Sequence, residues 1–593
     1  MRKLLLILLL LPVLVSAQKR RPGEARPTEA RPNIVILLSD DQGWGDLSVS
    51  GNTNLHTPNI DKIAKKGALF DRFYVQPVCS PTRAELLTGR YHPRLGVRST
   101  SEGGERFNLD ETTLAEAFKK AGYATAAFGK WHSGMQYPYH PNGRGFEEFY
   151  GYCSGHWGDY FSPMLEHNGA VAQGNGFLAD DLTEHAMTYM EGHKDQPFLV
   201  YVPFNTPHSP MQVPDRWWNI FKDKPLKMTA AQGDEENPDF TRAALAMCEN
   251  IDWNVGRIME KLKELKLEDN TIVIYFSDNG PNAFRWNGGM KGKKGSTDEG
   301  GVRSPLLMQY PKLIKPGTRV TDIAGVIDLL PTLVDLTGIT FQPPKPLDGV
   351  SLKPLLTRKG TLDKNRLLYS YWSGQTSVRS QQYRLDSRGK LYDMVADPGQ
   401  TTDISNRVPD VATRLKTAVQ KWKAEVLPGI AGKDPRTFPV GHPDVTFTQL
   451  PARDARPEGQ IKRSSVHPNC SFMTNWTQAD DAIVWEVEVV EDSDFEAVVY
   501  YTCAPENVGS AFRLSFGENS LLGKITEAHD PPLEGRAEDR VVRTESYVKD
   551  FKPLKIGTLH LKKGTGRLAL QAVDIAGAQV MDFRLLMLER VKK

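Results

Sequence analysis

Four short apolar runs constrain the fold of this chain more than any other feature of its sequence. They cover residues 33–39, 124–129, 197–204 and 271–277. Continuous apolar runs of this length are typical of strands that are buried on both faces of a sheet. Helical patterns lie between them, at 113–122 and over about 239–265. Strands that alternate with helices predict an α/β fold built on a parallel sheet.

Each apolar run is followed by residues that can do chemistry. In open parallel sheets, ligands bind beyond the carboxyl ends of the strands. A single Asp there is often a helix cap and a single His is usually ordinary structure, but all four runs share the feature. The residues are Asp40 and Asp41 after the first run, Lys130 and His132 after the second, His208 after the third, and Asp278 and Asn279 after the fourth.

The residue types in this group indicate a metal ion and an anion. Asp40, Asp41, Asp278 and Asn279 are hard oxygen donors. Three carboxylates that meet without a cation would repel one another, so we expect a bound Ca²⁺ or Mg²⁺. The neighbouring Lys and His side chains, with Arg83, suit a phosphate or sulfate group held between the metal and the cations.

The stretch VCSPTRAELLTGR (78–90) is predicted to be a loop that enters a helix. Pro81 suits a first helical turn and Gly89 suits the helix end. Cys79 comes just before the helix, where unpaired backbone N–H groups favour a negative charge. From the residues alone, Cys79 is a nucleophilic thiol, an inert buried cysteine or a residue with another role, and the buried cysteine is the commonest case.

The second half of the chain differs from the first in its predicted secondary structure. From about residue 362, short runs predict antiparallel strands, with a helix over 410–426 laid on them. Residues 432–462 are Pro-rich and irregular, which predicts a linker. Residues 463–593 alternate between apolar and polar positions, which predicts a β-sandwich or jelly roll. We expect this accessory domain to act as an independent module, and the alternative is a support that packs over the active-site cleft.

The N-terminus has the pattern of an export signal. Residues 1–17 combine Arg2 and Lys3, an apolar run and small residues for cleavage, which predicts a signal peptide. Residues 18–31 are rich in Pro and Arg and predict a tether. No later apolar run is long enough to span a bilayer, so we expect a secreted or periplasmic protein. The net charge of +2 gives no indication of a basic surface that binds nucleic acid.

The five cysteines are too few to form a disulfide scaffold. Cys470 and Cys503 lie in the same C-terminal region, and the sequence leaves open whether they pair. Cys248 falls on or beside an apolar helical stripe and is predicted to lie in the core, whereas the environment of Cys153 stays undetermined.

Taken in order, the motifs resemble those of the formylglycine-dependent (type I, arylsulfatase-like) sulfatases. CSPTR with AELLTGR resembles the first family signature, and GYATAAFGKWH resembles the second. SDNG, KGSTDEGGVRSP, IDLLPT, LDGVSLKPLL and GKLYDMVADPGQTTDIS follow in family order. The resemblance covers roughly residues 33–426 and implies an alkaline-phosphatase-like α/β fold. It implies a catalytic domain at 32–361 and a small antiparallel subdomain at 362–431, and it does not cover the accessory domain at 463–593.

The resemblance implies that Cys79 is converted to formylglycine (3-oxoalanine) by a maturation enzyme that reads Cys79, Pro81 and Arg83. One hydroxyl of the hydrated aldehyde, bound to Ca²⁺, would attack sulfur and expel the alcohol. The other hydroxyl would then lose its proton so that sulfate is released. A serine or thiol has no second hydroxyl and would stay trapped as an ester.

Further roles follow from the same resemblance. Asp40, Asp41, Asp278 and Asn279, with the converted Cys79, would hold one calcium ion. Arg83 would steady the hydrated aldehyde, Lys130 would bridge it to the sulfate, and His132 would accept the proton during release. His208 and Lys294 would grip the sulfate, and one of them would protonate the leaving oxygen. Lys294 is chosen over Lys291 and Lys293 because it directly precedes GSTDEGG, although the residues alone allow a solvated basic loop there.

The sequence therefore predicts a sulfuric ester hydrolase that acts on a sulfated carbohydrate or an aryl sulfate. The alternatives are a phosphate or phosphonate monoester hydrolase of the same superfamily and a catalytically inactive carbohydrate-binding protein. The segments SGHWGDYF and PNAFRWNGG are rich in residue types that bind sugars, and ordinary loop packing explains them as well. The candidate substrate residues in them are Trp157, Arg285 and Trp286.

Overall fold

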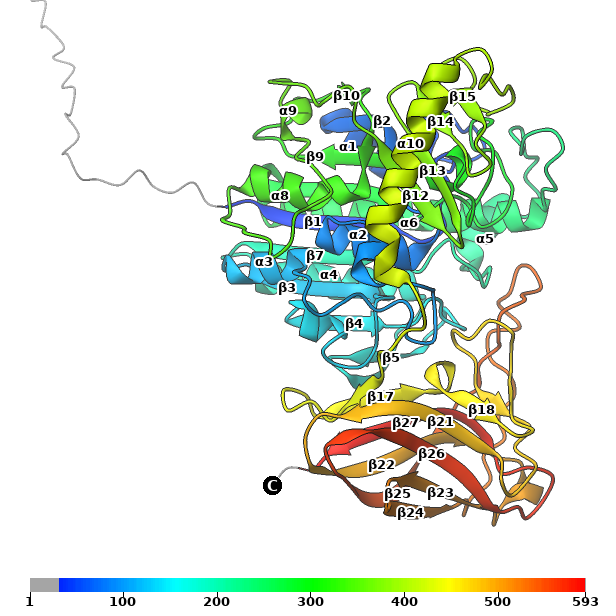
Figure 1. Cartoon of the computed structure of the whole chain (residues 1–593). Coiled ribbons are helices and arrows are strands. Elements are labelled where there is room, and N and C mark those ends of the chain that lie inside the picture. The colour runs from blue at the N-terminus through cyan, green and yellow to red at the C-terminus, as the bar shows by residue number, and fades with distance from the viewer. Residues whose placement is uncertain (1–30, 592–593) are drawn as a thin grey trace, which may run out of the picture.

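The computed structural model describes residues 31–591, and its largest unit is a mixed sheet with helices on both faces (Figure 1). The expected signal peptide (1–17) and nearly all of the tether (18–31) lie outside the described residues. Within the described residues this sheet has 11 strands in the order β10-β2-β9-β8-β1-β7-β3-β4-β5-β6, with β11 beside β2. They are β1 (Asn33–Ser39), β2 (Ala68–Tyr74), β3 (Ala124–Lys130), β4 (Glu148–Tyr152), β5 (Met164–His167), β6 (Ala170–Gln173), β7 (Phe198–Pro203), β8 (Thr271–Ser277), β9 (Arg303–Gln309), β10 (Thr318–Val320) and β11 (Ala324–Gly325).

The four apolar runs form the centre of this sheet, as predicted. β1 pairs in parallel with both β7 and β8, and β3 pairs in parallel with β7. β9 is antiparallel to β8 and to β2, so the sheet is mixed and not parallel throughout. The carboxyl ends of β1, β3, β7 and β8 therefore open on the same edge of the sheet.

Helices cover both faces of the sheet because both faces of its central strands are apolar. Along β1, Ile34, Ile36 and Leu38 face one core while Val35 and Leu37 face the other, and all five are 0% exposed. The first core includes α2 (Cys79–Thr88), α3 (Leu114–Lys120) and α8 (Leu329–Thr337), and the second includes α1 (Pro58–Lys66), α4 (Leu178–Gly192) and α6 (Pro238–Glu264). The shorter helices are α5 (Asp215–Phe221), α7 (Glu299–Val302) and α9 (Lys353–Leu356).

A small antiparallel sheet follows the main sheet in the chain, as predicted. It has the order β12 (Leu368–Trp372), β13 (Gln375–Arg379), β14 (Tyr383–Leu385) and β15 (Leu391–Asp393). Helix α10 (Pro409–Val426) packs on it, and Leu415 of the helix lies in one apolar cluster with Val378 and Leu385. A buried ion pair ties this sheet to the main domain, because Arg384 Nη2 lies 2.8 Å from Glu299 Oε2.

The C-terminal region is a sandwich of two sheets around one apolar core, at the bottom of Figure 1. Trp485 lies in that core at 1% exposure and packs edge-on against Phe583. One sheet contains β16 (Phe438–Val440), β18 (Arg456–Glu458), β21 (Ala482–Val489), β23 (Ala511–Phe516), β24 (Asn519–Lys524) and β26 (Gly564–Asp574). The other contains β17 (Phe447–Pro451), β19 (Lys462–Arg463), β20 (Met473–Thr474), β22 (Ser493–Thr502), β25 (Lys552–Leu561) and β27 (Asp582–Arg590).

The segment 432–462 is not the linker that its proline content predicted. It supplies β16, β17 and β18 to the sandwich, and β17 pairs with β27 over five residues, 447–451. Its prolines are compatible with strands because β16 and β18 pair on one side only, so no ladder hydrogen bond is needed on the other side. The sandwich therefore begins within the expected linker and is joined tightly to the preceding domain.

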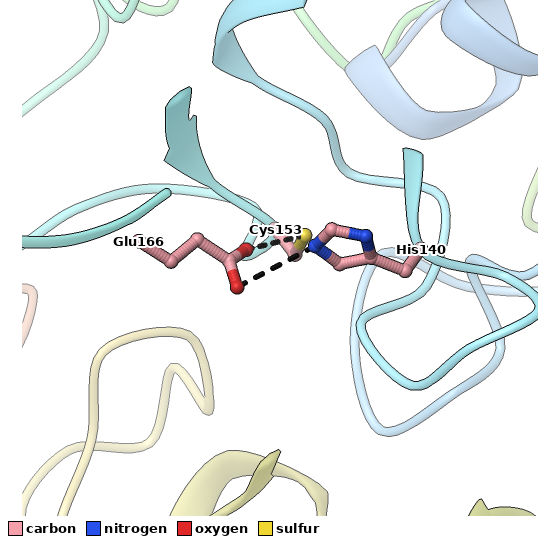
Figure 2. Close-up of side chains that lie close together, drawn as sticks. All are labelled: His140, Cys153 and Glu166. Carbon is pink, nitrogen blue, oxygen red and sulfur yellow. Dashed lines mark hydrogen bonds and ion pairs between the residues drawn. The ribbon is translucent and has the colours of Figure 1, made fainter. Parts of the chain in front are cut away.

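All five cysteines are free and buried within the described residues, so Cys470 and Cys503 are not paired. Cys248 lies in an apolar cluster, as predicted. Cys153 belongs to a buried cluster with His140 and Glu166 (Figure 2).

This cluster joins the main domain to the sandwich through hydrogen bonds on one carboxylate. Cys153 Sγ lies 2.9 Å from Glu166 Oε1, and His140 Nε2 lies 3.5 Å from Glu166 Oε2 (Figure 2). Gln449 of β17 donates to the same carboxylate at 2.6 Å. The backbone N–H of Asn142 donates to His140 Nδ1 at 3.2 Å, so Nδ1 is an acceptor and Nε2 faces Glu166. Burial, followed by Glu166, raises the pKa of Cys153, so this residue remains a thiol donor.

Candidate active site

The residues at the strand ends meet at one point, as the strand order requires. Ser39 of β1 is paired with Ser277 of β8, so Asp40 and Asp278 leave their strands side by side. The backbone N–H of Asp41 donates to Asp278 Oδ1 at 3.1 Å, and Asn279 Nδ2 donates to Asp41 Oδ1 at 2.8 Å. Asp40, Asp41, Asp278 and Asn279 are each 0% exposed.

Each carboxylate in this group faces its own cation. Lys130 Nζ lies 2.7 Å from Asp40 Oδ2, Arg83 Nη2 lies 2.7 Å from Asp278 Oδ2, and Lys294 Nζ lies 2.7 Å from Asp41 Oδ1. These cations offset part of the repulsion between the carboxylates, although, after burial, Asp278 and Asp41 still raise the pKa of Asp40. Repulsion alone therefore does not establish a metal ion, and further observations are needed.

The supporting observation is that two of these oxygen atoms lack a hydrogen bond within residues 31–591. Asp40 Oδ1 and Asn279 Oδ1 are buried and have no hydrogen-bond partner among the described residues. Ligand atoms of Asp40, Cys79 and Asp278 lie within 4.8 Å of one another, and so do those of Asp40, Asp41 and His208. Buried oxygens without partners are costly, and a hard cation satisfies them. The donor set therefore fits Ca²⁺ or Mg²⁺.

The electrostatics of the pairs set the charges of their members. Burial raises the pKa of Asp41, but His208 and Lys294 outweigh burial and hold it below its usual range. Burial lowers the pKa of Lys294, but Asp41 together with Cys79 and Asp40 outweighs burial and raises it, so Lys294 stays charged. Burial also dominates for Asp40 and raises its pKa well above its usual range.

The loop enters a helix as predicted, but Cys79 is the first residue of α2 and does not precede it, and it is 3% exposed. Thr82 fixes this turn because its Oγ1 donates to the carbonyl of Asp278 at 2.6 Å and accepts from Gln76 N at 2.9 Å. Arg83, one helical turn after Cys79, donates to the Asp278 carboxylate at 2.7 Å and to the carbonyl of Lys130 at 2.8 Å. The CSPTR motif is thereby tied to the carboxylate cluster.

A cavity of about 450 Å³ opens above this cluster. Asp41, Cys79, His132, His208 and Lys294 line it, whereas Arg83, Lys130 and the other predicted ligands lie behind its floor. The cavity is large enough for a small ligand. Lys291 instead pairs with Asp298 at 3.6 Å and Lys293 lies over the Phe284 ring, so Lys294 is the lysine of the KGKK run that reaches the site.

Two histidines in the cavity keep a ring nitrogen free. Burial, then Lys130, lowers the pKa of His132 well below its usual range. Its Nε2 lies 2.8 Å from the carbonyl of Thr100 and its Nδ1 has no partner among the described residues. His156 stacks on His208 with ring centroids 5.6 Å apart, and its Nε2 is likewise without a partner in the described chain.

The three predicted substrate residues are not brought to the cavity. Trp157 stacks on Tyr152 with ring centroids 5.0 Å apart, and Trp286 lies against Trp44 at 6.3 Å. Arg285 is buried, forms an ion pair with Asp46 at 2.7 Å and donates to the Asp41 carbonyl at 3.0 Å, so it supports the loop that carries Asp41. Residue composition alone suggested them. Arg285 is buried, and the half-buried rings of Trp157 and Trp286 pack against other aromatic rings.

Most of the cavity wall consists of residues that the sequence did not predict. Those from the domains before the sandwich include Thr100, Ser101, Ser209 and Trp372. Those from the sandwich are His467, Pro468, Asn469, Thr544 and Glu545. No local motif marks these residues, since they come from loops that are distant in the sequence. The participation of the sandwich supports the alternative in which it packs over the cleft.

Comparisons with known proteins agree with the geometry. Residues 32–339 match the family model Sulfatase, and residues 293–425 match the model N-sulphoglucosamine sulphohydrolase, C-terminal. The chain is 32% identical to human N-acetylgalactosamine-6-sulfatase over 57% of this chain and 68% of that protein. It is 32% identical to rat arylsulfatase G over 62% of this chain and 77% of that protein. Among solved structures, that of Ps i-CgsB in complex with k-i-k-neocarrahexaose is similar, with a TM-score of 0.62, 29% identity, and coverage of 67% of this chain and 94% of that one.

Proposed function

The chain belongs to the sulfatase family, and from this premise we propose that it removes sulfate from a sulfated carbohydrate with a nucleophile made from Cys79. Family membership makes it a sulfuric ester hydrolase with the alkaline-phosphatase-like fold. The observation that carries the finer proposal is the place of Cys79. It begins α2 at the floor of the cavity, within metal-binding distance of Asp40 and Asp278, in a CSPTR sequence.

The family implies a calcium ion and a formylglycine, and the residues present in the site are compatible with both. Asp40, Asp41, Asp278 and Asn279, with the converted Cys79, would hold a Ca²⁺ ion, which supplies Lewis-acid polarisation of a bound oxygen. Conversion of Cys79 to formylglycine by a maturation enzyme would supply a nucleophile with a second hydroxyl for release of the product. The side-chain oxygens of Asp40 and Asn279 that lack a hydrogen bond in the described chain support the first assignment, and the CSPTR turn supports the second.

The side chains around Cys79 divide the remaining tasks. Arg83 and Lys130 lie behind the floor and are held by carboxylates, so they would orient the nucleophile and present positive charge to the sulfate. His132 is uncharged at neutral pH and has a free Nδ1, so it would accept a proton during release. His208 and Lys294 reach Asp41 from the cavity side, and they would hold the sulfate while one of them protonates the leaving oxygen.

The substrate class and the location are part of the same proposal. The relatives include enzymes named for N-acetylgalactosamine 6-sulfate, and a sulfated glycan fits a cavity lined by hydroxyl, amide and imidazole groups. The N-terminal sequence favours export of the protein to a compartment in which such glycans occur. No helix in residues 31–591 is long and apolar enough to cross a membrane.

A panel of esters tests this proposal against the phosphate and phosphonate alternative and against an inactive binding protein. The protein is produced with a maturation enzyme, and release of sulfate or phosphate is measured on matched pairs of aryl and hexose esters. We expect sulfate release from the sulfate esters and loss of that activity in Cys79→Ala. Faster hydrolysis of the phosphate partners, or turnover of no ester at all by aldehyde-bearing protein, would reject the proposal.

A further inference from the structure

The wall of the cavity opposite the main sheet comes from the C-terminal sandwich. On the basis of the proposed function, we propose that the sandwich completes the substrate pocket and that Glu545 selects sugar units whose sole anionic group is the sulfate to be removed. The sandwich contributes His467, Pro468, Asn469, Thr544 and Glu545 to the cavity that also contains Cys79 and His208.

The first wall segment, 467–469, is fixed by buried contacts with the main domain. Asn469 is 8% exposed and donates through Nδ2 to the carbonyl of Thr100 at 3.2 Å. Its Oδ1 accepts from Arg453 at 2.8 Å and from Ser154 at 3.2 Å. Cys470 adds a contact of 2.8 Å from its sulfur to the carbonyl of His156. The segment is therefore held against the two loops that carry Thr100 and His156 of the cavity.

The second wall segment lies in the long loop between β24 and β25, which rises from the sandwich toward α5 in Figure 1. Arg540 N donates to the carbonyl of Met211 at 2.9 Å, and Arg540 Nη2 lies 2.6 Å from Asp215 Oδ1. Gln212 Nε2 donates to the carbonyl of Gly535 at 2.7 Å. These bonds seat the loop on the chain that directly follows His208, so Glu545 has a defined position beside the sulfate end of the cavity.

Glu545 is itself held in that position. The hydroxyl of Ser209, the residue after His208, donates to Glu545 Oε1. Burial raises the pKa of Glu545, but the Ser209 hydrogen bond and His208 outweigh burial and lower it, so the side chain is ionised at neutral pH. One oxygen of the carboxylate is engaged by Ser209, and a carboxylate has further lone pairs for a ligand.

The distribution of charge in the cavity restricts the sugar. Among the described residues that line it, Lys294 is the one lysine or arginine, and it is paired with Asp41 at the sulfate end. The sandwich wall offers an imidazole, an amide, a hydroxyl and the Glu545 carboxylate. A second sulfate or a uronate carboxylate would find no guanidinium or ammonium there and would be repelled by Glu545. Sugar hydroxyls or an amine, in contrast, can donate to that carboxylate.

Kinetics on esters that differ by one charge test this inference. The panel contains N-acetylgalactosamine 4-sulfate, 6-sulfate and 4,6-disulfate, together with phenyl sulfate and a carboxyphenyl sulfate. We expect the matured protein to favour the singly charged member of each pair that it turns over by about 10- to 100-fold in kcat/KM. Glu545→Gln keeps the size of the side chain and an acceptor for Ser209, and it should reduce this preference severalfold or more. Glu545→Lys should reduce it further or reverse it.

Glu534→Gln is the matched control, because Glu534 is exposed on the same loop and does not line this cavity. It should keep the wild-type preference. A wild-type preference for the doubly charged esters, or an unchanged preference in both Glu545 variants, would overturn the inference while leaving the sulfatase activity intact. If no sulfate is released from any ester, the proposed function itself fails.

Discussion

One buried arginine, Arg453, is among the contacts that attach the sandwich to the main domain, and its removal is the sharpest test of how the cavity is built. Arg453 is 2% exposed and donates to Glu105 of the main domain, which is 0% exposed. Its Nε lies 3.1 Å from Asp454 Oδ1, and its Nη1 donates to Asn469 of the cavity wall at 2.8 Å. Arg453→Met keeps much of the side-chain volume but leaves Glu105 without its cation.

The expected cost follows from burial. Removing one partner of a buried ion pair costs about 3–5 kcal/mol, because the remaining charge stays out of water. If the sandwich unfolds as a unit, this corresponds to a fall of roughly 10 °C in its melting temperature. Asn469 also loses a donor, so the wall segment loosens and kcat/KM for the sulfate ester falls as well.

The pH dependence gives the prediction a second signature. Burial raises the pKa of Glu105, but Arg453, with smaller contributions from His132, a backbone hydrogen bond and Arg106, outweighs burial and lowers it. A carboxyl whose folded pKa is lowered adds stability above its unfolded pKa, near 4.3, and that stability is lost as the pH falls through the folded value. Without Arg453 burial would raise the pKa of Glu105, and the variant would gain stability on protonation. The difference between wild type and variant should therefore be largest at pH 7 and shrink toward pH 4.

Arg456→Met is the control, measured by calorimetry or fluorescence over the same pH range. The Arg456 side chain is 59% exposed and pairs with Glu458 at 2.9 Å, so its loss should cost at most about 1 kcal/mol. If Arg453→Met melts like Arg456→Met at pH 7, or if its deficit grows as the pH falls, the reasoning about the buried pair is refuted.

Three further predictions concern the strand-end cluster and the sandwich. Asn279→Ala removes a side-chain oxygen that has no hydrogen-bond partner among the described residues, and it should lower the Ca²⁺ content measured by elemental analysis. The control Asn282→Ala, at the cavity wall, should retain the metal. Equal metal content in the two variants would contradict the assignment of Asn279 as a calcium ligand. Chelation of the matured protein should lower its melting temperature, and Ca²⁺ at 100 times its Kd should restore about 2.7 kcal/mol; a melting temperature indifferent to Ca²⁺ would argue against the site. Asp539→Ala removes the carboxylate that Arg543 and Gln212 contact at the base of the second wall segment. This variant should have a lower kcat/KM on small and polymeric sulfate esters alike. A loss confined to the polymeric substrate would instead support the interpretation of the sandwich as an independent module.

The sequence was sufficient to predict the strand-end group because two local rules determine it. The apolar runs are buried on both faces, and parallel pairing then forces Asp40, Lys130, His208 and Asp278 to one edge. The choice of Lys294 needed the family resemblance, since nothing local distinguishes it from Lys291.

The cavity wall and the attachment of the sandwich depend on long-range packing that no local pattern records. Glu545 meets Ser209 across 336 positions of sequence, and Arg453 meets Glu105 across 348. Conversely, the residue types of Trp157 and Trp286 suggested a sugar site, although both rings are used to pack against other aromatic rings. The Pro-rich segment 432–462 was wrongly predicted for a related reason, because Pro439 and Pro457 occupy strands that pair on one side only.

The central claim is that sulfate hydrolysis depends on a converted Cys79, and its most direct test measures conversion and activity on the same preparations. Preparations with graded conversion are made by varying the maturation enzyme. The fraction of the Cys79 peptide that has exchanged sulfur and two hydrogens for one oxygen is read by mass spectrometry, and sulfate release is measured in parallel. We predict that the rate rises in proportion to the converted fraction and vanishes at zero conversion and in Cys79→Ala. Full activity in protein whose Cys79 is entirely unmodified thiol would contradict the account.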